Sequence, residues 1–289
     1  MKSNRATPYI FLIIPLFLFC FVLVYPMIEN VYLSFTNWDG KSDPKFVGLE
    51  NYAYFFKDPM TYISLFNTLI WVALAMALPV ALGLIVAVMA EGAKYESIYK
   101  GIIFAPFALS GVVVGLVWRL LYEPSYGMVN TILRSIGLSS LALPWLGLPG
   151  VNTYFMIIAS TWSAMPGSMV IFIAGLKSIP VDIIDAAKAD GAKGWGLFRS
   201  ITFPLLMPFT TVIVAMTILN TLKVFDIIYI MTTGGPFRSS ETLAVTMFFD
   251  AFSLRQYGYG SAVGTILFLI IVVITIAYLH YSFKGELKY

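Results

Sequence analysis

The sequence has very little of three kinds of residue, namely cysteine, histidine and charged residues. Of its 289 residues, one is cysteine, one is histidine and only 11% are charged. The single Cys20 excludes an internal disulfide framework and a cysteine-based metal cluster, and the lone His280 argues against a histidine-based metal site. The net charge is only +3 and the basic residues are dispersed, so we expect no nucleic acid partner.

Motifs of catalysis and nucleotide binding are also missing. The sequence contains no Gly-x4-Gly-Lys-Ser/Thr phosphate loop, so this chain does not hold ATP by that device. It also lacks a Gly-x-Ser-x-Gly nucleophile elbow and a His-Glu-x-x-His zinc site. We therefore expect that the chain is not an enzyme and has no catalytic residue, metal ligand or bound cofactor.

What the sequence has in excess is apolar residues, at 59% of the chain with a mean hydropathy of +0.85. A fold in water would have too little polar surface to cover them, whereas about 20 apolar residues span a bilayer. Lys2 and Arg5 precede the first apolar run as in a signal peptide, but no small-residue cleavage site follows. We predict an all-α integral membrane protein, a single domain over 1–289 with spans at about 9–33, 67–90, 101–122, 153–176, 203–224 and 262–281.

Two of the connections between spans carry specific expectations. Arg119 and Glu123 are four residues apart on one helix face, which predicts an ion pair at the membrane interface rather than a role in substrate binding. The next connection is rich in glycine, proline and serine, and it is predicted to hold a short interfacial helix at 127–136.

The most polar connection, 177–202, lies between the fourth and fifth spans. Its pattern predicts two short helices around a turn, with Ser178 as N-cap, Pro180 at the first helical position and Gly191 as the stop. Apolar residues recur at helical spacing within it, so it presents an apolar helix face outside the membrane. A solvated connector is the alternative interpretation.

This connection resembles the EAA signature of membrane subunits of ATP-binding-cassette importers. The resemblance rests on Asp185-Ala186-Ala187, on Gly191 six positions later, and on Ile201 and Pro204, within a stretch similar to sugar permeases of the maltose and glycerol-3-phosphate type. Asp185 departs from the family's usual glutamate, a shorter carboxylate that alters one contact but not the role. The resemblance implies that the coupling loop, 177–202, contacts a separate ATPase subunit through Asp185, Ala186, Ala187, Asp190, Gly191, Ala192, Phe198, Ile201 and the adjacent Pro204.

Three other stretches, at 34–56, 118–138 and 225–236, are similar to the same family, so the resemblance covers nearly the whole chain. It implies the type I importer permease fold in the cytoplasmic (inner) membrane, and translocation of a mono- or oligosaccharide. It also implies a second homologous permease subunit, two copies of an ATP-binding subunit that hold ATP and Mg, and an extracytoplasmic solute-binding protein.

Charge orients the spans, because cytoplasmic connections carry an excess of Lys and Arg. The set 1–8, 91–100, 177–202 and 282–289 holds 10 basic residues in 52, whereas 34–66, 123–152 and 223–261 hold 7 in 102. The first set is therefore predicted to face the cytoplasm, which places both termini and the coupling loop on that side.

Two stripes of neutral residues inside the spans are candidates for the substrate path. Hydroxyls and amides beside aromatic residues suit an uncharged sugar better than an ion, and by resemblance to the maltose-type permease these positions line a cavity near the middle of the membrane. The alternative is that the hydroxyls bond neighbouring helices or their own carbonyls. The stripes are Ser160, Ser163 and Gly167 in the fourth span, and Thr217, Asn220, Thr221 and Val224 in the fifth.

Beyond these stripes, Lys223 and Asp226 are expected to pair with each other. A self-sufficient secondary transporter or a channel remains an alternative function, although a coupled carrier would place acidic groups in mid-span and show inverted repeats. An importer of a solute other than a sugar is a further alternative.

The orientation can be tested with cysteines introduced at Lys193 and Arg238 in a Cys20→Ser background. The two positions belong to opposite charge sets, so we expect a membrane-impermeant thiol reagent to label them from opposite sides. Labelling of both cysteines from one side would contradict the six-span topology.

Overall fold

The computed structural model describes residues 7–91 and 96–286. Within these ranges every regular element is a helix, and extended segments pair only at an isolated bridge between Thr36 and Phe46. The all-α class expected from the sequence is confirmed. Part of the charge comparison used Lys2, Arg5, Lys94 and Lys288, which lie outside the described residues.

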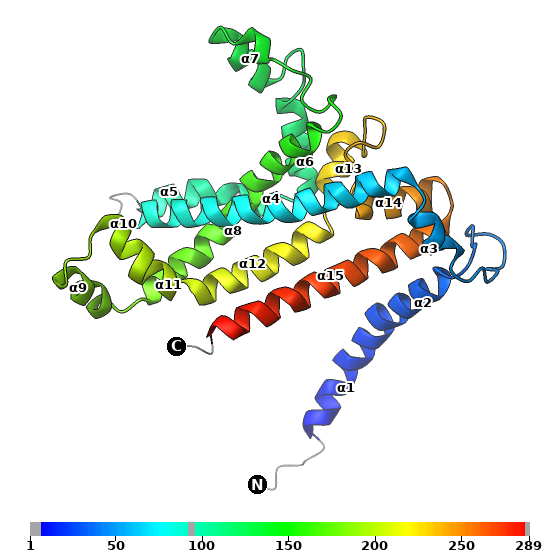
Figure 1. The fold of residues 1–289 in the computed structure, drawn as a ribbon, viewed down its shortest axis with the longest axis horizontal. Helices are drawn as coiled ribbons and strands as arrows, with labels where there is room; N and C mark the ends of the chain where they lie inside the picture. The colour runs from blue at the N-terminus through cyan, green and yellow to red at the C-terminus, as the bar shows by residue number, and fades with distance from the viewer. Residues whose placement is uncertain (1–6, 92–95, 287–289) are drawn as a thin grey trace. The chain divides into compact units, whose positions relative to one another are not determined.

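Fifteen α-helices follow one another in the described ranges (Figure 1). They are α1 Thr7–Phe19, α2 Tyr25–Leu33, α3 Glu50–Phe55, α4 Pro59–Ala90, α5 Glu96–Phe104, α6 Gly111–Leu121, α7 Met128–Ser135, α8 Asn152–Ser178, α9 Val181–Ala189, α10 Gly194–Leu197, α11 Phe203–Leu205, α12 Met207–Leu222, α13 Asp226–Thr232, α14 Leu243–Phe248 and α15 Tyr257–Glu286. Turns of π-helix occupy Cys20–Val24, Phe198–Thr202 and Phe249–Ser253, and turns of 3-10 helix occupy Ala105–Ala108 and Ser139–Leu141.

Among the described residues, four helices are long and apolar enough to cross a membrane, and the number rises to six if each of two bent pairs is one span. The four are Phe11–Leu33, Pro59–Ala90, Asn152–Ser178 and Tyr257–His280. The short helix predicted at 127–136 is present as α7.

The third predicted span, 101–122, is not one continuous helix. Ile98–Ala108 and Gly111–Leu121 meet at an angle of 100°. Pro106 has no N–H to donate, Leu109 is extended, and the Ser110 side chain accepts a hydrogen bond from Val113 N at the start of α6. The chain therefore ends one helix and begins another at Leu109 and Ser110.

The fifth predicted span, 203–224, is also divided. Gly194–Leu205 and Met207–Leu222 meet at 66°, with the break at the fully buried Leu206. Pro208 lies in the first turn of α12, where its missing N–H leaves no bond unmade. Helix α12 ends at Leu222, two residues before the predicted end.

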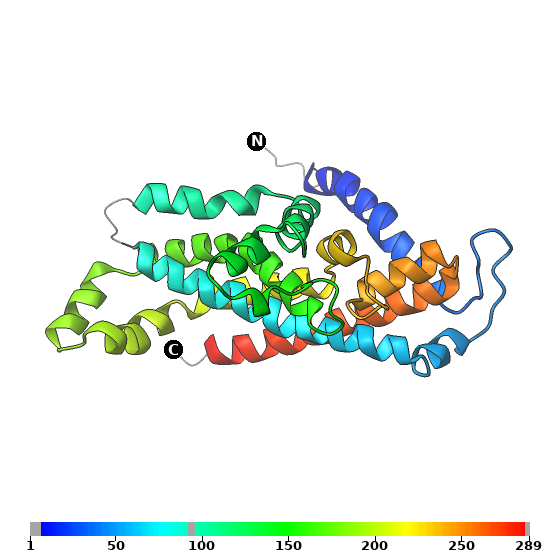
Figure 2. The same ribbon diagram turned by 90° about the horizontal axis from the view of Figure 1, so that it is seen from above.

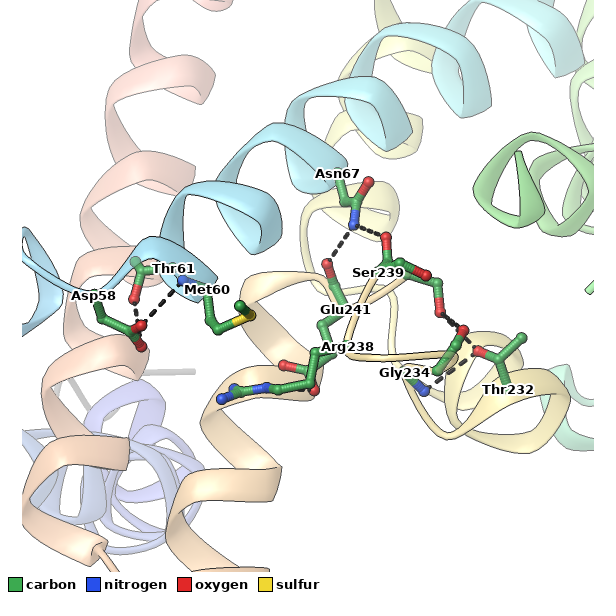
Figure 3. Close-up of polar contacts among 11 residues, drawn as sticks. Asp58, Met60, Thr61, Asn67, Thr232, Gly234, Arg238, Ser239 and Glu241 are labelled. Carbon is green, nitrogen blue, oxygen red and sulfur yellow. Dashed lines mark hydrogen bonds and ion pairs between the residues drawn. The ribbon is translucent and has the colours of Figure 1, made fainter. Parts of the chain in front are cut away.

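The chain divides into two compact units. The first contains the chain up to Tyr62 together with Thr246–Leu269, and the second contains Ile63–Val245 together with the chain from Ile270 onward. In the first unit Asn30 donates to Ser261 O at 3.3 Å and to Thr265 Oγ1 at 3.2 Å, which joins α2 to α15. Asp58 Oδ1 accepts Met60 N at 3.0 Å and so caps the start of α4 (Figure 3).

The core of the second unit is built in two parts. Trp71 of α4, Met156 of α8 and Ile228 of α13 are fully buried in one cluster. Residues of α4, α8 and α12 form the other cluster, around Phe172 and Leu206. In this unit α9 and α10 lie past the C-terminal end of α8, whereas α13 lies near its N-terminal end (Figures 1 and 2).

Helices α4 and α8 approach closely at Gly83. A Cβ built there would lie 2.7 Å from Ser168 Cβ and 2.9 Å from Met169 N, so no larger residue fits without a shift of the helices. Small residues at such crossings are typical of membrane helices. Lipid provides no hydrophobic force that would drive the helices together, so close packing has to stabilise their contact.

Buried hydrogen bonds fix the loop between α13 and α14 (Figure 3). Asn67 of α4 donates to the carbonyls of Ser239 and Glu241 at 2.8 and 2.9 Å. Asn152, the first residue of α8, donates to Gly235 O at 2.8 Å. The loop is therefore attached to two long helices.

Side chains of the same loop also bond one another. Arg238 Nε donates to Glu241 Oε1 at 2.8 Å, although Glu241 is only 2% exposed, and the hydroxyls of Thr232 and Ser240 lie 2.8 Å apart. We call this set the polar clamp: Asn67, Asn152, Thr232, Arg238, Ser240 and Glu241.

Substituting Asn67 by alanine leaves the backbone carbonyls of Ser239 and Glu241 without their donor. We expect Asn67→Ala to lower the free energy of unfolding by about 1–3 kcal/mol, the usual penalty for a buried polar group left unbonded. Thermal unfolding of the solubilised protein measures the change. Thr131→Ala on the exposed surface of α7 is the control, and an equal melting temperature in both variants would show that the clamp does not stabilise the fold.

Candidate functional site

The coupling loop contains a short helix with a defined stop. In α9, Gly191 N donates to Lys188 O and Ala192 N donates to Ala187 O, both at 3.0 Å. These two bonds form a Schellman motif, which needs a residue in the left-handed conformation. Gly191 supplies it with a φ of +92°, as the sequence predicted.

The start of α9 differs from the prediction. Ser178 is the last residue of α8 and its hydroxyl donates to Gly175 O at 2.7 Å, so it does not cap α9. Pro180 is the N-cap and α9 begins at Val181. Because the residue before a proline is driven out of the helical region, α8 stops at Ser178 and Ile179 is extended.

Apolar side chains of the coupling loop face solvent. Val181 and Trp195 are 70% and 71% exposed, and Ile183 is also exposed. The Trp195 ring stacks on Phe198 at a centroid distance of 5.3 Å, which fixes its position. An exposed, ordered apolar surface of this kind is typical of a docking site for another protein.

The nine residues predicted for coupling lie on this one continuous segment. Asp185, on the exposed side of α9, is 3.6 Å from Lys188 Nζ. Ala187, Ala192, Phe198 and Ile201 are half-buried, because α9 packs against the π-helical turn that follows α10. The exposed members are Asp185, Ala186, Asp190, Gly191 and Pro204.

On α8 the predicted stripe of Ser160, Ser163 and Gly167 is present. Ser163 Oγ donates to Ser160 O at 3.0 Å, within its own helix. The Phe107 ring packs directly against Gly167, because a Cβ added at Gly167 would lie 2.7 Å from a ring carbon. Phe107 is half exposed and lies at the break between α5 and α6. Sequence reasoning missed it, although Pro106 within an apolar run signals the break.

On α12 the hydroxyls are also bonded locally. Thr217 donates to Ile213 O at 2.7 Å and Thr221 to Thr217 O at 2.9 Å. Asn220 is exposed, and no residue in the described ranges hydrogen-bonds its amide. Val224 does not share this face, because α12 ends at Leu222 and Val224 O instead accepts Thr242 Oγ1 at 3.2 Å.

Two expected ion pairs are not formed within the described ranges. Arg119 donates to Ile230 O at 3.2 Å rather than to Glu123. The Glu123 carboxylate accepts the backbone N–H groups of Ser125 and Tyr126 at 2.6 and 2.8 Å.

Lys223 and Asp226 likewise belong to different helix ends. Lys223 is the C-cap of α12, whereas Asp226 is the first residue of α13. The Asp226 side chain packs against Gly111, where an added Cβ would lie 3.3 Å from Asp226 Cβ.

Sequence reasoning also missed the polar clamp. Its only signal in the sequence was the Gly234-Gly235-Pro236 turn followed by Arg238 and Glu241, the two charged residues of an otherwise uncharged stretch.

Comparisons with known proteins identify this architecture. Residues 79–284 match the family described as "Binding-protein-dependent transport system inner membrane component". The chain belongs to this family, and it is a multi-pass permease subunit of the inner membrane, as the resemblance implied.

Relatives and a solved structure agree over most of the chain. A probable ABC transporter permease protein of Pyrococcus horikoshii is 36% identical over 290 residues, 99% of both chains. The trehalose/maltose transport system permease protein MalF of Thermococcus litoralis is 34% identical over 81% of this chain and 79% of its own length. A chain of a bacterial ABC transporter that imports the acidic polysaccharide alginate has the same fold, with a TM-score of 0.87, 21% identity, and 97% and 96% of the two chains covered.

Proposed function

We propose that this chain is one of two homologous permease subunits of an ATP-driven importer of mono- or oligosaccharides. The observation that carries the proposal is the coupling loop, a short helix with a fixed stop and an exposed apolar surface at the end of α8. The names of the trehalose/maltose relative and the alginate importer support a carbohydrate as the substrate.

In this proposal ATP and Mg are held by two copies of a separate ATP-binding subunit, and the present chain binds no cofactor. Movement of the ATPase subunits is transmitted through α9 and then to α8, which precedes α9 in the chain and is joined to it by the two residues Ile179 and Pro180. A solute-binding protein delivers the sugar from the other side of the bilayer.

We infer that the coupling loop and both termini are cytoplasmic, as the charge distribution predicts. Position 238 is a poor choice for the labelling experiment, because Arg238 bonds the buried carboxylate of Glu241 and a cysteine there would disturb the polar clamp. Lys41 belongs to the same charge set and is exposed, so it is the better partner for Lys193.

We further infer that Asn220, with the α8 stripe, lies on the substrate path. An amide offers two donors and one acceptor oxygen, which suits the hydroxyls of a sugar. Phe107 contributes an aromatic ring next to Gly167, and apolar ring faces pack well on the C–H surface of saccharides.

A substitution at Gly191 tests coupling. A valine in the left-handed region costs about 1–2 kcal/mol and displaces the end of α9. We therefore expect Gly191→Val to lose ATP hydrolysis stimulated by the loaded binding protein, or assembly with the ATPase. Gly191→Asn is the matched control, since asparagine enters this region at less cost. Equal hydrolysis in the wild type and Gly191→Val would argue strongly against the assignment.

Asn220 tests the substrate path. We expect Asn220→Ala to reduce ATP-dependent sugar uptake into proteoliposomes by about five- to 150-fold, as a lost contact of about 1–3 kcal/mol implies. Ser163→Ala should have a smaller effect, because its hydroxyl proton is already used within α8. Thr210→Ala on α12 is the control, as Thr210 donates only to Leu206 O. Normal uptake of every tested sugar by Asn220→Ala would place the path elsewhere.

A further inference from the structure

The first unit contains a cavity that none of the roles above uses. It has a volume of about 390 Å³ and is formed by the connection between α2 and α4 and by the residues that open α15. No residue of this cavity belongs to α8 or α12. Its lining residues are Asn37, Trp38, Asp39, Asn51, Tyr54, Arg255, Gln256 and Tyr259.

The walls of the cavity are held in place by contacts within the unit. Gly258 N donates to Trp38 O at 3.0 Å, and Asn51 Nδ2 donates to the carbonyls of Ser34 and Thr36, both at 2.8 Å. Gly40, with a φ of +83°, lies directly against the Tyr257 ring and leaves no space for a side chain. The cavity is therefore preformed, which lowers the entropic cost of binding a ligand.

Its aromatic residues are also fixed. Trp38 packs on Tyr257 at 5.1 Å, and Tyr54 meets Tyr259 edge to face at 4.9 Å. Tyr259 is buried and its hydroxyl lies 3.2 Å from Thr61 Oγ1, while Tyr54 is exposed. The cavity thus offers apolar ring surface beside polar groups.

Asp39 contributes a permanent negative charge. Hydrogen bonds from the backbone N–H groups of Ser42 and Lys41, and then from the Ser42 hydroxyl, lower the pKa of Asp39 to about 2. All three bonds end on Oδ1, at 2.8 to 2.9 Å. Among the described residues, none bonds Oδ2, which leaves that atom for a ligand.

Arg255 contributes the opposite charge from a strained position. Its φ is +58°, in the left-handed region where glycine or asparagine would cost less free energy. The bonds from Leu254 N to Phe249 O and from Gln256 N to Asp250 O hold this turn on both sides. A long charged residue at such a position points to a function of the side chain rather than of the backbone.

We propose that this cavity is a binding site for neutral saccharides. Carboxylate, guanidinium and amide groups each present two hydrogen-bonding atoms in a plane, which matches neighbouring hydroxyls of a sugar ring, and the aromatic residues cover its apolar surface. The charges of Asp39 and Arg255 balance, so no net positive charge offsets the desolvation of a uronate carboxylate, and the site favours an uncharged ligand. The proposal rests on carbohydrate transport and adds a second sugar site, separate from the stripes on α8 and α12.

The test measures sugar binding to the assembled transporter in lipid nanodiscs, without the solute-binding protein. Glucose, maltose, trehalose and maltotriose are the neutral probes, and an alginate disaccharide is the acidic probe. Saturation-transfer NMR should detect at least one neutral sugar, and the acidic probe should bind at least about tenfold more weakly. Binding of none of the neutral sugars, or equal binding of the acidic one, would overturn the proposal.

Variants assign the binding to this cavity. Arg255→Gly removes the guanidinium and relieves the backbone strain, so we expect an unchanged or higher melting temperature together with at least about tenfold weaker binding. Gln256→Ala should weaken binding similarly. Lys57→Ala is the control, as Lys57 is exposed on the same connection but does not line the cavity. Wild-type affinity in Arg255→Gly and Gln256→Ala would refute the site.

Failure of the cavity proposal can be distinguished from failure of the proposed sugar-permease function. If the chain is not a sugar permease, ATP-dependent sugar uptake is absent in the wild type whether or not the cavity binds sugar. If only this inference is wrong, uptake is normal and the cavity variants leave sugar binding unchanged. Asn220→Ala provides the converse case, because it should reduce uptake while sugar binding in the cavity persists.

Discussion

In a bilayer every backbone N–H and C=O must find its partner within the protein, and this constraint governs the whole chain. It accounts for the long helices, but the interrupted segments show its force more clearly. Where the third predicted span breaks, Ser110 bonds the first turn of α6. Where the chain leaves helix between α13 and α14, Asn67 and Asn152 provide donors for carbonyls that no helix satisfies. The polar clamp is thus what an irregular loop against membrane helices requires.

Helix α8 connects this clamp with the coupling loop. It starts at Asn152, whose side chain bonds the clamp loop, and it ends at Ser178, two residues before the Pro180 cap of α9. Its 27 residues correspond to a length of about 40 Å, roughly the thickness of a membrane with its headgroups. A displacement of α9 therefore has a continuous helical path to the opposite end of the second unit. The Schellman stop at Gly191 matters for the same reason, since a frayed α9 would absorb such a displacement.

The sequence predicted the helical class, the approximate positions of the long helices and the turn at Gly191, because hydropathy and glycine placement are local signals. Polar pairings were predicted poorly. Arg119 and Glu123 have helical spacing, yet each bonds a backbone group instead, and these groups become available only through helix ends that the tertiary fold creates. Val224 was placed on a helix that stops two residues earlier. The clamp joins residues more than 80 positions apart, which spacing within one segment cannot reveal.

The bonding of the hydroxyls also bears on how a sugar would pass. Ser163, Thr217 and Thr221 have each committed their proton to a carbonyl of their own helix, so they offer a ligand only acceptor lone pairs. Among the predicted substrate-path residues, Asn220 presents donors as well, and the Ser160 hydroxyl also makes no hydrogen bond within the described ranges. Such a surface binds a sugar weakly, and weak binding is what passage requires, because a ligand held tightly would not leave. Selection by affinity then belongs at sites outside the spans, where binding and release are separate events.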